Sequence, residues 1–262
     1  MTLGRLLERI DASRESSTPL LMCAIVAGDP FLEATSEHMG VVAEHGADII
    51  ELIHPFSAPS FHGPVIQRSS MRARREGVTL EELAEQIEEF RAEYDTPVVV
   101  SSYINRLMTQ GFARAAEVLA GAGADGVALT DVPWAQSAPF RQALRDAGLA
   151  FVPAAGPTTT LERYRLMEDE GVPVALWTGH VGSKIGEVQE LLALLEQDAR
   201  AHPSIALIAS MQVSTAAEAR TVTDRAAGVL IGSALAWIIE GRGADLHERL
   251  GAFVKEVREA IG

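Results

Sequence analysis

The chain has 262 residues, of which 47% are hydrophobic, and its 36 acidic and 22 basic residues give a formal net charge of −14. This length fits one large α/β barrel or two small domains, and no Ser/Gly-rich or Pro-rich linker divides the chain, so we predict a single domain spanning residues 1–262. The negative charge disfavours binding to nucleic acid or anionic membranes, and no apolar run approaches the roughly 20 residues that a membrane span requires. The expected partners are small molecules or another protein.

The amino-terminal segment and the cysteine content both indicate a soluble, cytoplasmic protein. Residues 1–15 are rich in charge, and no hydrophobic stretch with a small-residue cleavage site follows them, so no export signal is expected. The one cysteine, Cys23, lies in the apolar run of residues 20–25, where a buried and inert thiol is expected rather than a nucleophile. These features fit a reducing compartment.

Short apolar runs alternate along the chain with longer segments of helical periodicity, which predicts eight repeats of strand followed by helix. Strands are expected at residues 20–26, 47–53, 97–103, 126–130, 150–154, 172–178, 205–210 and 228–231. Helical patterns include residues 79–94, 111–122, 135–147 and 187–201, and capping boxes are expected at Thr79/Glu82, Thr159/Glu162 and Thr215/Glu218. Eight such units predict an α/β fold of the (β/α)8 TIM-barrel type. A doubly wound open sheet is the alternative, although its Gly-x-Gly-x-x-Gly turn is missing after the first strand, where only Gly28 stands.

The segment that follows the second predicted strand carries the strongest candidates for chemistry. Glu51 lies at the end of this apolar strand, and a loop broken by prolines and glycines follows with His54 and His62. A partly desolvated carboxylate at the mouth of a barrel has a raised pKa and serves as a general acid or base, and an imidazole complements it in proton transfer. The alternatives are a Glu51 that pairs with an arginine or caps a helix, and histidines that are merely exposed. Sequence alone does not decide between His54 and His62.

Two glycine turns before predicted helices are candidates for anion binding. They are Thr178-Gly-His-Val-Gly-Ser-Lys at residues 178–184 and Gly232-Ser233 before the helix expected at 234–240. Free backbone N–H groups at a helix start attract anions, and barrel enzymes often hold a phosphate in their late loops. Metal-ligand spacings, Walker sequences and Gly-x-Ser-x-Gly elbows do not occur, so we expect no metal and no serine-hydrolase chemistry.

These marks together resemble the α subunit of tryptophan synthase, a TIM-barrel lyase that cleaves indole-3-glycerol phosphate to indole and glyceraldehyde 3-phosphate by a retro-aldol step. The resemblance runs from about residue 19 to residue 240. The segments that carry it are Ala-Gly-Asp-Pro at 27–30, Gly-Ala-Asp-Ile-Ile-Glu-Leu at 46–52, Pro-Phe-Ser at 55–57, Gly-Pro-Val-Ile-Gln at 63–67, Gly-Val-Thr-Leu at 77–80, Tyr103, Asn105, Asp-Val-Pro at 131–133, Pro-Thr-Thr at 157–159, and Gly-Ser-Ala at 232–234.

The resemblance implies roles for particular residues. Glu51 matches the catalytic glutamate that carries protons to C3 of the indole and from the glycerol hydroxyl, and no cofactor is needed for this reaction. His62 and Tyr103 are expected to assist it. The implied substrate-binding residues are Asn105, Asp131, Gly179, Gly182, Gln212, Gly232 and Ser233. A subunit similar to the β subunit of tryptophan synthase is a possible partner.

The chain departs from the family pattern near the ligand and at the partner surface. His62 stands where the family has a second carboxylate, and a neutral imidazole accepts the indole N–H hydrogen bond without a fixed negative charge. Gln212 replaces a glycine of the Gly-Phe-Gly-Ile-Ser loop, Val181 replaces a threonine, Ile53 replaces a glycine beside Glu51, and Ala58 replaces an aspartate. We therefore predict a diverged lyase of the α type that acts on indole-3-glycerol phosphate or on an altered substrate. The alternatives are a housekeeping α subunit and a catalytically silent protein that modulates a partner.

Overall fold

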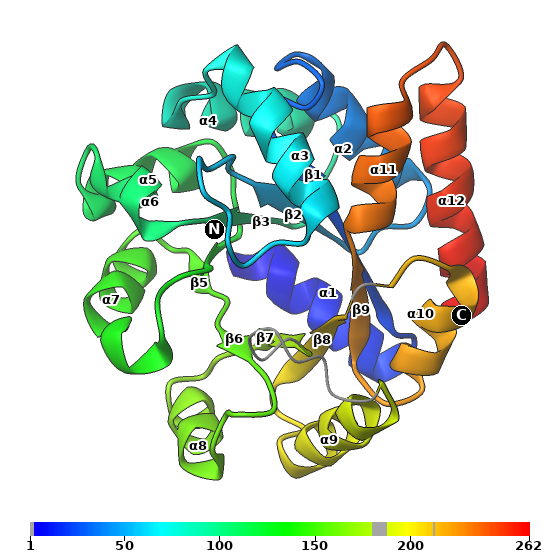
Figure 1. Ribbon diagram of the computed structural model, residues 1–262. Coiled ribbons are helices and arrows are strands. Elements are labelled where there is room, and N and C mark those ends of the chain that lie inside the picture. The colour runs from blue at the N-terminus through cyan, green and yellow to red at the C-terminus, as the bar shows by residue number, and fades with distance from the viewer. Residues whose placement is uncertain (1–2, 180–187, 212) are drawn as a thin grey trace.

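The computed structural model describes residues 3–179, 188–211 and 213–262, in which nine parallel strand segments form one curled sheet surrounded by helices (Figure 1). The strands are β1 Leu20–Val26, β2 Ile49–Ile53, β3 Val98–Ser102, β4 Gly126–Leu129, β5 Ala150–Phe151, β6 Ala154–Ala155, β7 Val174–Thr178, β8 Ala206–Ser210 and β9 Gly228–Ile231. The helices are α1 Leu3–Ser16, α2 Ala34–Glu44, α3 Pro64–Ala73, α4 Leu80–Arg91, α5 Ile104–Met108, α6 Phe112–Gly121, α7 Ala138–Asp146, α8 Leu161–Asp169, α9 Val188–Ala201, α10 Ala216–Thr223, α11 Ser233–Gly241 and α12 Leu246–Ile261, with short 3₁₀ helices η1 Arg74–Glu76 and η2 Trp134–Gln136.

The sheet closes through its fifth strand, which is divided into β5 and β6. The hydrogen-bonded order runs β5-β4-β3-β2-β1-β9-β8-β7-β6, so the two halves lie at the two ends of that order while following each other in the chain. Between them, the Val152 N–H donates to the Val127 carbonyl at 2.9 Å, and the Pro153 carbonyl accepts from the Leu176 N–H at 2.9 Å. Pro153 has no N–H to donate, which explains the division of this strand. The prediction of a (β/α)8 barrel is confirmed.

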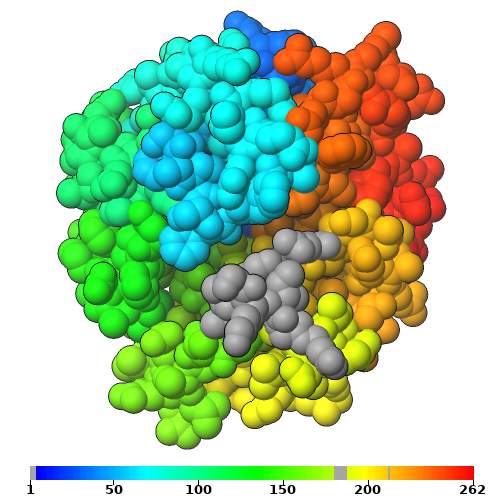
Figure 2. All heavy atoms as spheres, viewed as in Figure 1, coloured from blue at the N-terminus to red at the C-terminus, as the bar shows by residue number. Residues whose placement is uncertain are grey.

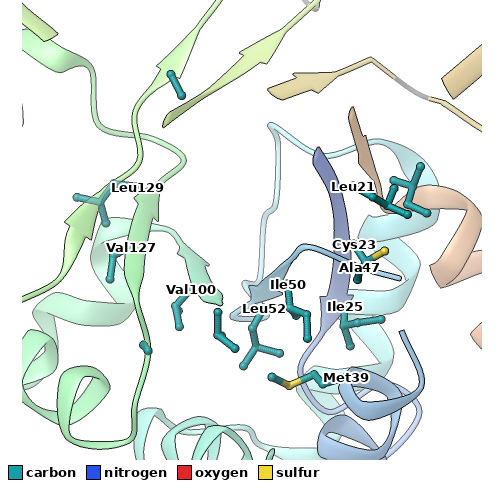
Figure 3. Close-up of a cluster of buried hydrophobic side chains, with 14 of the residues drawn as sticks. Leu21, Cys23, Ile25, Met39, Ala47, Ile50, Leu52, Val100, Val127 and Leu129 are labelled. Atoms are coloured by element: carbon teal, nitrogen blue, oxygen red, sulfur yellow. The ribbon is translucent and has the colours of Figure 1, made fainter. Parts of the chain in front are cut away.

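Side chains alternate along each strand between the barrel interior and the surrounding helices. The outward positions, such as Leu52 and Val100, pack in the main apolar core with helix residues such as Met39 (Figure 3). The inward positions form a second apolar cluster, in which Ile49 and Val99 pack with residues of the other strands. The continuous apolar runs of the sequence thus reflect strands that are buried on both faces.

Helix α1 closes the amino-terminal end of the barrel, which we call the floor. Its Leu6 and Ile10 are buried in the interior cluster. Its Arg5 donates from Nε to the Oδ1 of Asp125 at 3.0 Å, and Asp125 directly precedes β4. The interior is therefore filled from the floor side, and the carboxyl ends of the strands form the opposite side, which we call the mouth.

Two local predictions are wrong. Helix α8 begins after Thr160, whose hydroxyl accepts from the Arg163 N–H, whereas the Thr159 hydroxyl accepts from the Gly156 N–H and closes the preceding turn. The capping boxes predicted at Thr79/Glu82 and Thr215/Glu218 are confirmed. The helix predicted over residues 135–147 is split into η2 and α7, and α7 begins at Ala138 with a proline in its first turn, where proline favours a helix start.

Among the described residues, no helix combines the length and the apolar character needed to cross a membrane.

Candidate active site

Glu51 lies on the inward face of β2 near the mouth of the barrel. Its neighbours Ile50 and Leu52 belong to the outer core, whereas Ile49, one alternation below it, belongs to the interior cluster. The strand register places Glu51 opposite Val99 of β3. The carboxylate thus stands one step above an apolar layer, and its side chain is buried with 6% of its surface exposed.

Burial strongly perturbs the acidity of Glu51. Desolvation raises its pKa from 4.5 to about 7, and a hydrogen bond from the Ser101 hydroxyl opposes this rise. None of the ion pairs formed within residues 3–179, 188–211 and 213–262 includes Glu51. The alternative of a Glu51 neutralised by an arginine therefore finds no support there. A carboxyl group with a pKa near the working pH both gives and takes a proton readily.

The loop of residues 54–63 joins β2 to α3 and carries both candidate histidines, and part of this segment lies on the face that Figure 2 turns toward the viewer. His54 is buried and locked in hydrogen bonds. Its Nε2 accepts from the Nη2 of Arg106 at 2.7 Å and from the Nε at 3.1 Å, and its Nδ1 lies 3.3 Å from the Ser102 hydroxyl. Burial and the Arg106 charge lower the pKa of His54 to about 3, so the ring is neutral. Its geometry is that of a structural residue.

His62 differs from His54 in the hydrogen bonding of its ring. Its Nδ1 is buried and has no hydrogen-bond partner among the described residues. Burial lowers the pKa of His62 from 6.5 to about 4, which keeps the imidazole neutral at neutral pH. A buried polar atom without a partner is costly unless a ligand or water satisfies it. Of these two histidines, His54 has both ring nitrogens next to described hydrogen-bonding groups, and the functional role of His62 stays a prediction.

Tyr103 lies at the end of β3 and is surrounded by the rings of the 54–63 loop. Its ring stacks on Phe56 with centroids 4.5 Å apart, and the centroid of the His62 ring lies 6.0 Å away. Its hydroxyl accepts the Phe61 N–H at 3.0 Å. Burial raises the pKa of Tyr103, and hydrogen bonds from Phe61 and Ser60 oppose the rise. The side chain therefore contacts the loop extensively.

Asn105 and Asp131 occupy different environments near the start of α5. The Oδ1 of Asp131 accepts the Ile104 N–H at 2.8 Å and so fixes the first turn of this helix. Asn105 is exposed on the same turn. The structure thus brings Asp131 next to the start of α5, which directly follows Tyr103, while substrate contacts of Asn105 and Asp131 stay predictions.

The predicted anion-binding residues lie after the last strands. Gly232 precedes α11 and Ser233 is its first residue, so the free N–H groups of this helix start at the mouth. Gly179 is buried directly after β7, and a side chain at this position would meet Leu191 and Met211. Gly182 and Gln212 lie outside the described residues.

Sequence reasoning missed the residues that hold Glu51 and the 54–63 loop in place without being candidates for catalysis. Ser101, two positions beyond Val99 and therefore inward-facing, follows from strand alternation. Gln67 donates from Nε2 to the His62 carbonyl at 2.8 Å, and Arg106 holds His54, but neither contact has a sequence pattern that predicts it. Among the described residues, no group of three or more His, Cys, Asp or Glu side chains is arranged to hold a metal ion. The expected lack of a cofactor stays a prediction.

Comparison with known proteins identifies the family. The model of the family "Tryptophan synthase alpha chain" matches residues 10–261. The chain is similar to the tryptophan synthase alpha chain of Laribacter hongkongensis, with 35% identity over 99% of both chains, and to that of Geobacter sulfurreducens, with 33% identity over 95% of this chain and 96% of the relative. The crystal structure of tryptophan synthase subunit alpha from Legionella pneumophila superposes with a TM-score of 0.91 and 29% identity over 98% of both chains. The chain therefore belongs to the tryptophan synthase alpha chain family, and the prediction of an α-type lyase on a (β/α)8 barrel is confirmed.

Proposed function

We propose that this lyase cleaves the bond between an indole ring and a glycerol-phosphate-like side chain by a retro-aldol reaction, with Glu51 as the proton carrier. The observation that carries the proposal is a buried carboxyl group at the barrel mouth, outside any ion pair of the described residues, whose pKa is raised to about 7. Such a group is half protonated near neutral pH, which suits a step that needs an acid first and a base second.

The proposed reaction returns Glu51 to its starting state. The protonated Glu51 gives its proton to C3 of the indole, which leaves a cationic ring. The resulting carboxylate then takes the proton of the side-chain hydroxyl next to the scissile bond. The electron pair of the O–H bond forms the aldehyde carbonyl, the C–C bond breaks, and its electrons restore the neutral indole. One residue thus serves as acid and base without net proton uptake.

His62 is proposed to accept a hydrogen bond from the indole N–H. Its Nδ1 is buried without a partner among the described residues, and its pKa of about 4 keeps it an acceptor across the neutral range. A neutral acceptor stabilises the cationic ring less than a carboxylate would, because it carries no net charge. Because of this departure from the family pattern, we propose that the substrate is indole-3-glycerol phosphate or an altered indole compound.

The start of α11 is proposed to bind the anionic end of the substrate. Gly232 and Ser233 leave backbone N–H groups free at the positive end of the helix dipole, and Asn105, Asp131 and Gly179 are proposed as further ligand contacts. Gln212 and Gly182 are proposed to complete this region, in which the glutamine side chain would crowd a phosphate or bind an uncharged polar group.

The test of the chemistry is the Glu51→Gln variant, assayed for indole release from indole-3-glycerol phosphate and from its unphosphorylated analogue. We expect a loss of about 100-fold or more in kcat, since a general acid or base contributes roughly two to four orders of magnitude. Glu85→Gln, the same change on an exposed helix residue, is the control and should keep full activity. Unchanged turnover in Glu51→Gln would refute the assignment of Glu51, whereas a lack of indole release by the wild-type protein would favour a silent, partner-modulating protein.

The test of the substrate is the rise in melting temperature with each of the two ligands. Tight binding stabilises a folded protein by mass action. A shift with the unphosphorylated indole compound supports the altered substrate, whereas a shift with the phosphate ester alone supports a housekeeping α subunit. In the housekeeping case, a pyridoxal-phosphate-dependent β subunit should stimulate indole release.

Two further assignments belong to the proposal. A β-like subunit is proposed as the protein partner, in line with the family's name of a synthase chain. A cytoplasmic location is proposed from the single buried thiol of Cys23, whose pKa burial raises above its ordinary value, so that it stays an unreactive thiol.

A further inference from the structure

The backbone around His62 is held by two side chains from outside the loop. On one side, the Phe61 N–H donates to the Tyr103 hydroxyl at 3.0 Å. On the other side, the His62 carbonyl accepts from Nε2 of Gln67 at 2.8 Å. Between these two points the loop adds only a turn, in which the His62 N–H donates to the Pro59 carbonyl at 3.0 Å. The imidazole is thus attached to a short backbone segment that is held by a hydrogen bond on each side.

Tyr103 is itself rigidly placed. It is 4% exposed and directly precedes α5, whose first turn is fixed by the bond from the Ile104 N–H to Asp131. One turn later, Arg106 donates to His54 at the start of the loop and to the Val78 carbonyl. The end of β3, the start of α5 and the first residue of the loop therefore form one hydrogen-bonded unit, which provides a stable support for the loop.

We propose that Tyr103 and Gln67 are positioning residues, which clamp the backbone on either side of His62 and hold its imidazole at the barrel mouth. The inference rests on the proposed function, in which His62 contacts the indole ring. It gives Tyr103 a positioning role instead of the catalytic role expected from sequence, because its hydroxyl is already bonded to the Phe61 N–H. An exposed loop without such clamps would lose the imidazole geometry to conformational freedom.

The test removes each of the two hydrogen bonds that hold the loop, in separate variants. Tyr103→Phe keeps the stacking on Phe56 but deletes the acceptor of the Phe61 N–H, and Gln67→Ala removes the second clamp. In both variants we expect kcat to fall about 10-fold with KM changed less than about twofold, as expected for a group that matters mainly in the transition state. The control is Tyr94→Phe, which deletes a hydroxyl bonded to the Glu44 carboxylate at 2.5 Å on the outer surface and should leave kcat unchanged.

A double-variant cycle distinguishes a positioning role of Tyr103, which acts through His62, from a catalytic role of its own. If Tyr103 acts through His62, Tyr103→Phe should cause no further loss in a His62→Ala background. If the two losses multiply, the proposal is wrong, because Tyr103 then contributes on its own.

A titration of the His62 ring by NMR keeps the proposal testable without turnover. The clamped ring is buried, with a pKa of about 4, and release of the loop should raise this pKa toward 6.5 by a unit or more in Tyr103→Phe and Gln67→Ala but not in Tyr94→Phe. An unmoved titration curve would overturn the clamp. If the wild-type protein releases no indole while the titration moves as expected, the proposed function fails and the clamp stands.

Discussion

The two ends of the barrel bury carboxylates in opposite ways. At the floor, Asp125 is fully buried and bonded to Arg5 at 3.0 Å, to Arg91 at 2.6 Å and to the Val98 N–H at 2.8 Å. At the mouth, Glu51 is also buried, but within the described residues it belongs to no ion pair. The same functional group is thus satisfied at one end and left available at the other.

The paired carboxylates of the floor stabilise the fold, whereas the carboxyl group at the mouth is available for chemistry. A buried charge that keeps its partners holds elements together, because removal of one partner leaves the others desolvated and unpaired. Asp48, before β2, follows the floor pattern, with Arg258 at 2.7 Å and the Leu21 N–H at 2.7 Å. A buried carboxyl group outside any ion pair destabilises the folded state in its charged form, and such a cost is typical of an active site.

The largest expected effect is on stability at the floor. Asp125→Ala leaves Arg91 unpaired in a buried site, and we expect the free energy of unfolding to fall by about 3–5 kcal/mol, measured by urea denaturation. Asp224→Ala is the matched control, since the Asp224–Arg220 pair at 3.6 Å is exposed on both sides and should change stability by less than about 1 kcal/mol. Equal losses in the two variants would show that the buried ion pairs of Asp125 stabilise the protein no more than an exposed ion pair does.

The next effect is a pH dependence that arises at the mouth. The folded-state pKa of Glu51, about 7, lies above its ordinary value of 4.5, so the folded protein binds this proton more tightly than the unfolded chain. Wild-type stability should therefore decrease as pH rises from about 4.5 to about 7 and stay reduced above that range. Glu51→Gln lacks this loss, so its stability advantage over wild type should grow to about 3 kcal/mol at pH 8, at about 1.4 kcal/mol per pKa unit.

Unfolding curves of both proteins at pH 5 and pH 8 measure this difference. If the two proteins show the same pH dependence, the carboxyl group is not desolvated, and the contrast between floor and mouth disappears.

Much of this contrast follows from the sequence, and the missing part has a physical reason. Alternation along the apolar run around Glu51 places the carboxylate inward, and the (β/α)8 pattern places it at the mouth. The pairing of Asp125 with Arg5 joins residues 120 positions apart, and the bond from the Phe61 N–H to Tyr103 spans 42 positions. Such contacts depend on tertiary packing, for which local patterns carry no information.

The two histidines of the loop show the same limit. His54 and His62 are eight positions apart in one irregular segment, and nothing in their neighbours predicts that Arg106 reaches one of them. Residue type and loop composition therefore left both as candidates, and only the family resemblance pointed to His62. Only the three-dimensional arrangement shows that Arg106 holds the His54 ring, whereas Nδ1 of His62 has no hydrogen-bond partner within residues 3–179, 188–211 and 213–262.

The smallest expected effects on stability come from removing one or the other of these two histidine rings. His54→Ala removes the acceptor of the Arg106 guanidinium in a buried site, so we expect a loss of about 1–3 kcal/mol in the free energy of unfolding, the cost of leaving a buried donor unpaired. His62→Ala removes a ring nitrogen that is unpaired among the described residues and should cost less than about 1 kcal/mol. Its kcat should instead fall at least 10-fold, since a hydrogen bond to the developing cation is lost.

Urea denaturation and indole-release assays on both variants measure the loss of stability expected for His54→Ala and the loss of activity expected for His62→Ala. A stable but inactive His54→Ala together with an active His62→Ala would reverse the assignment, because the functional nitrogen would then be the one that Arg106 already holds.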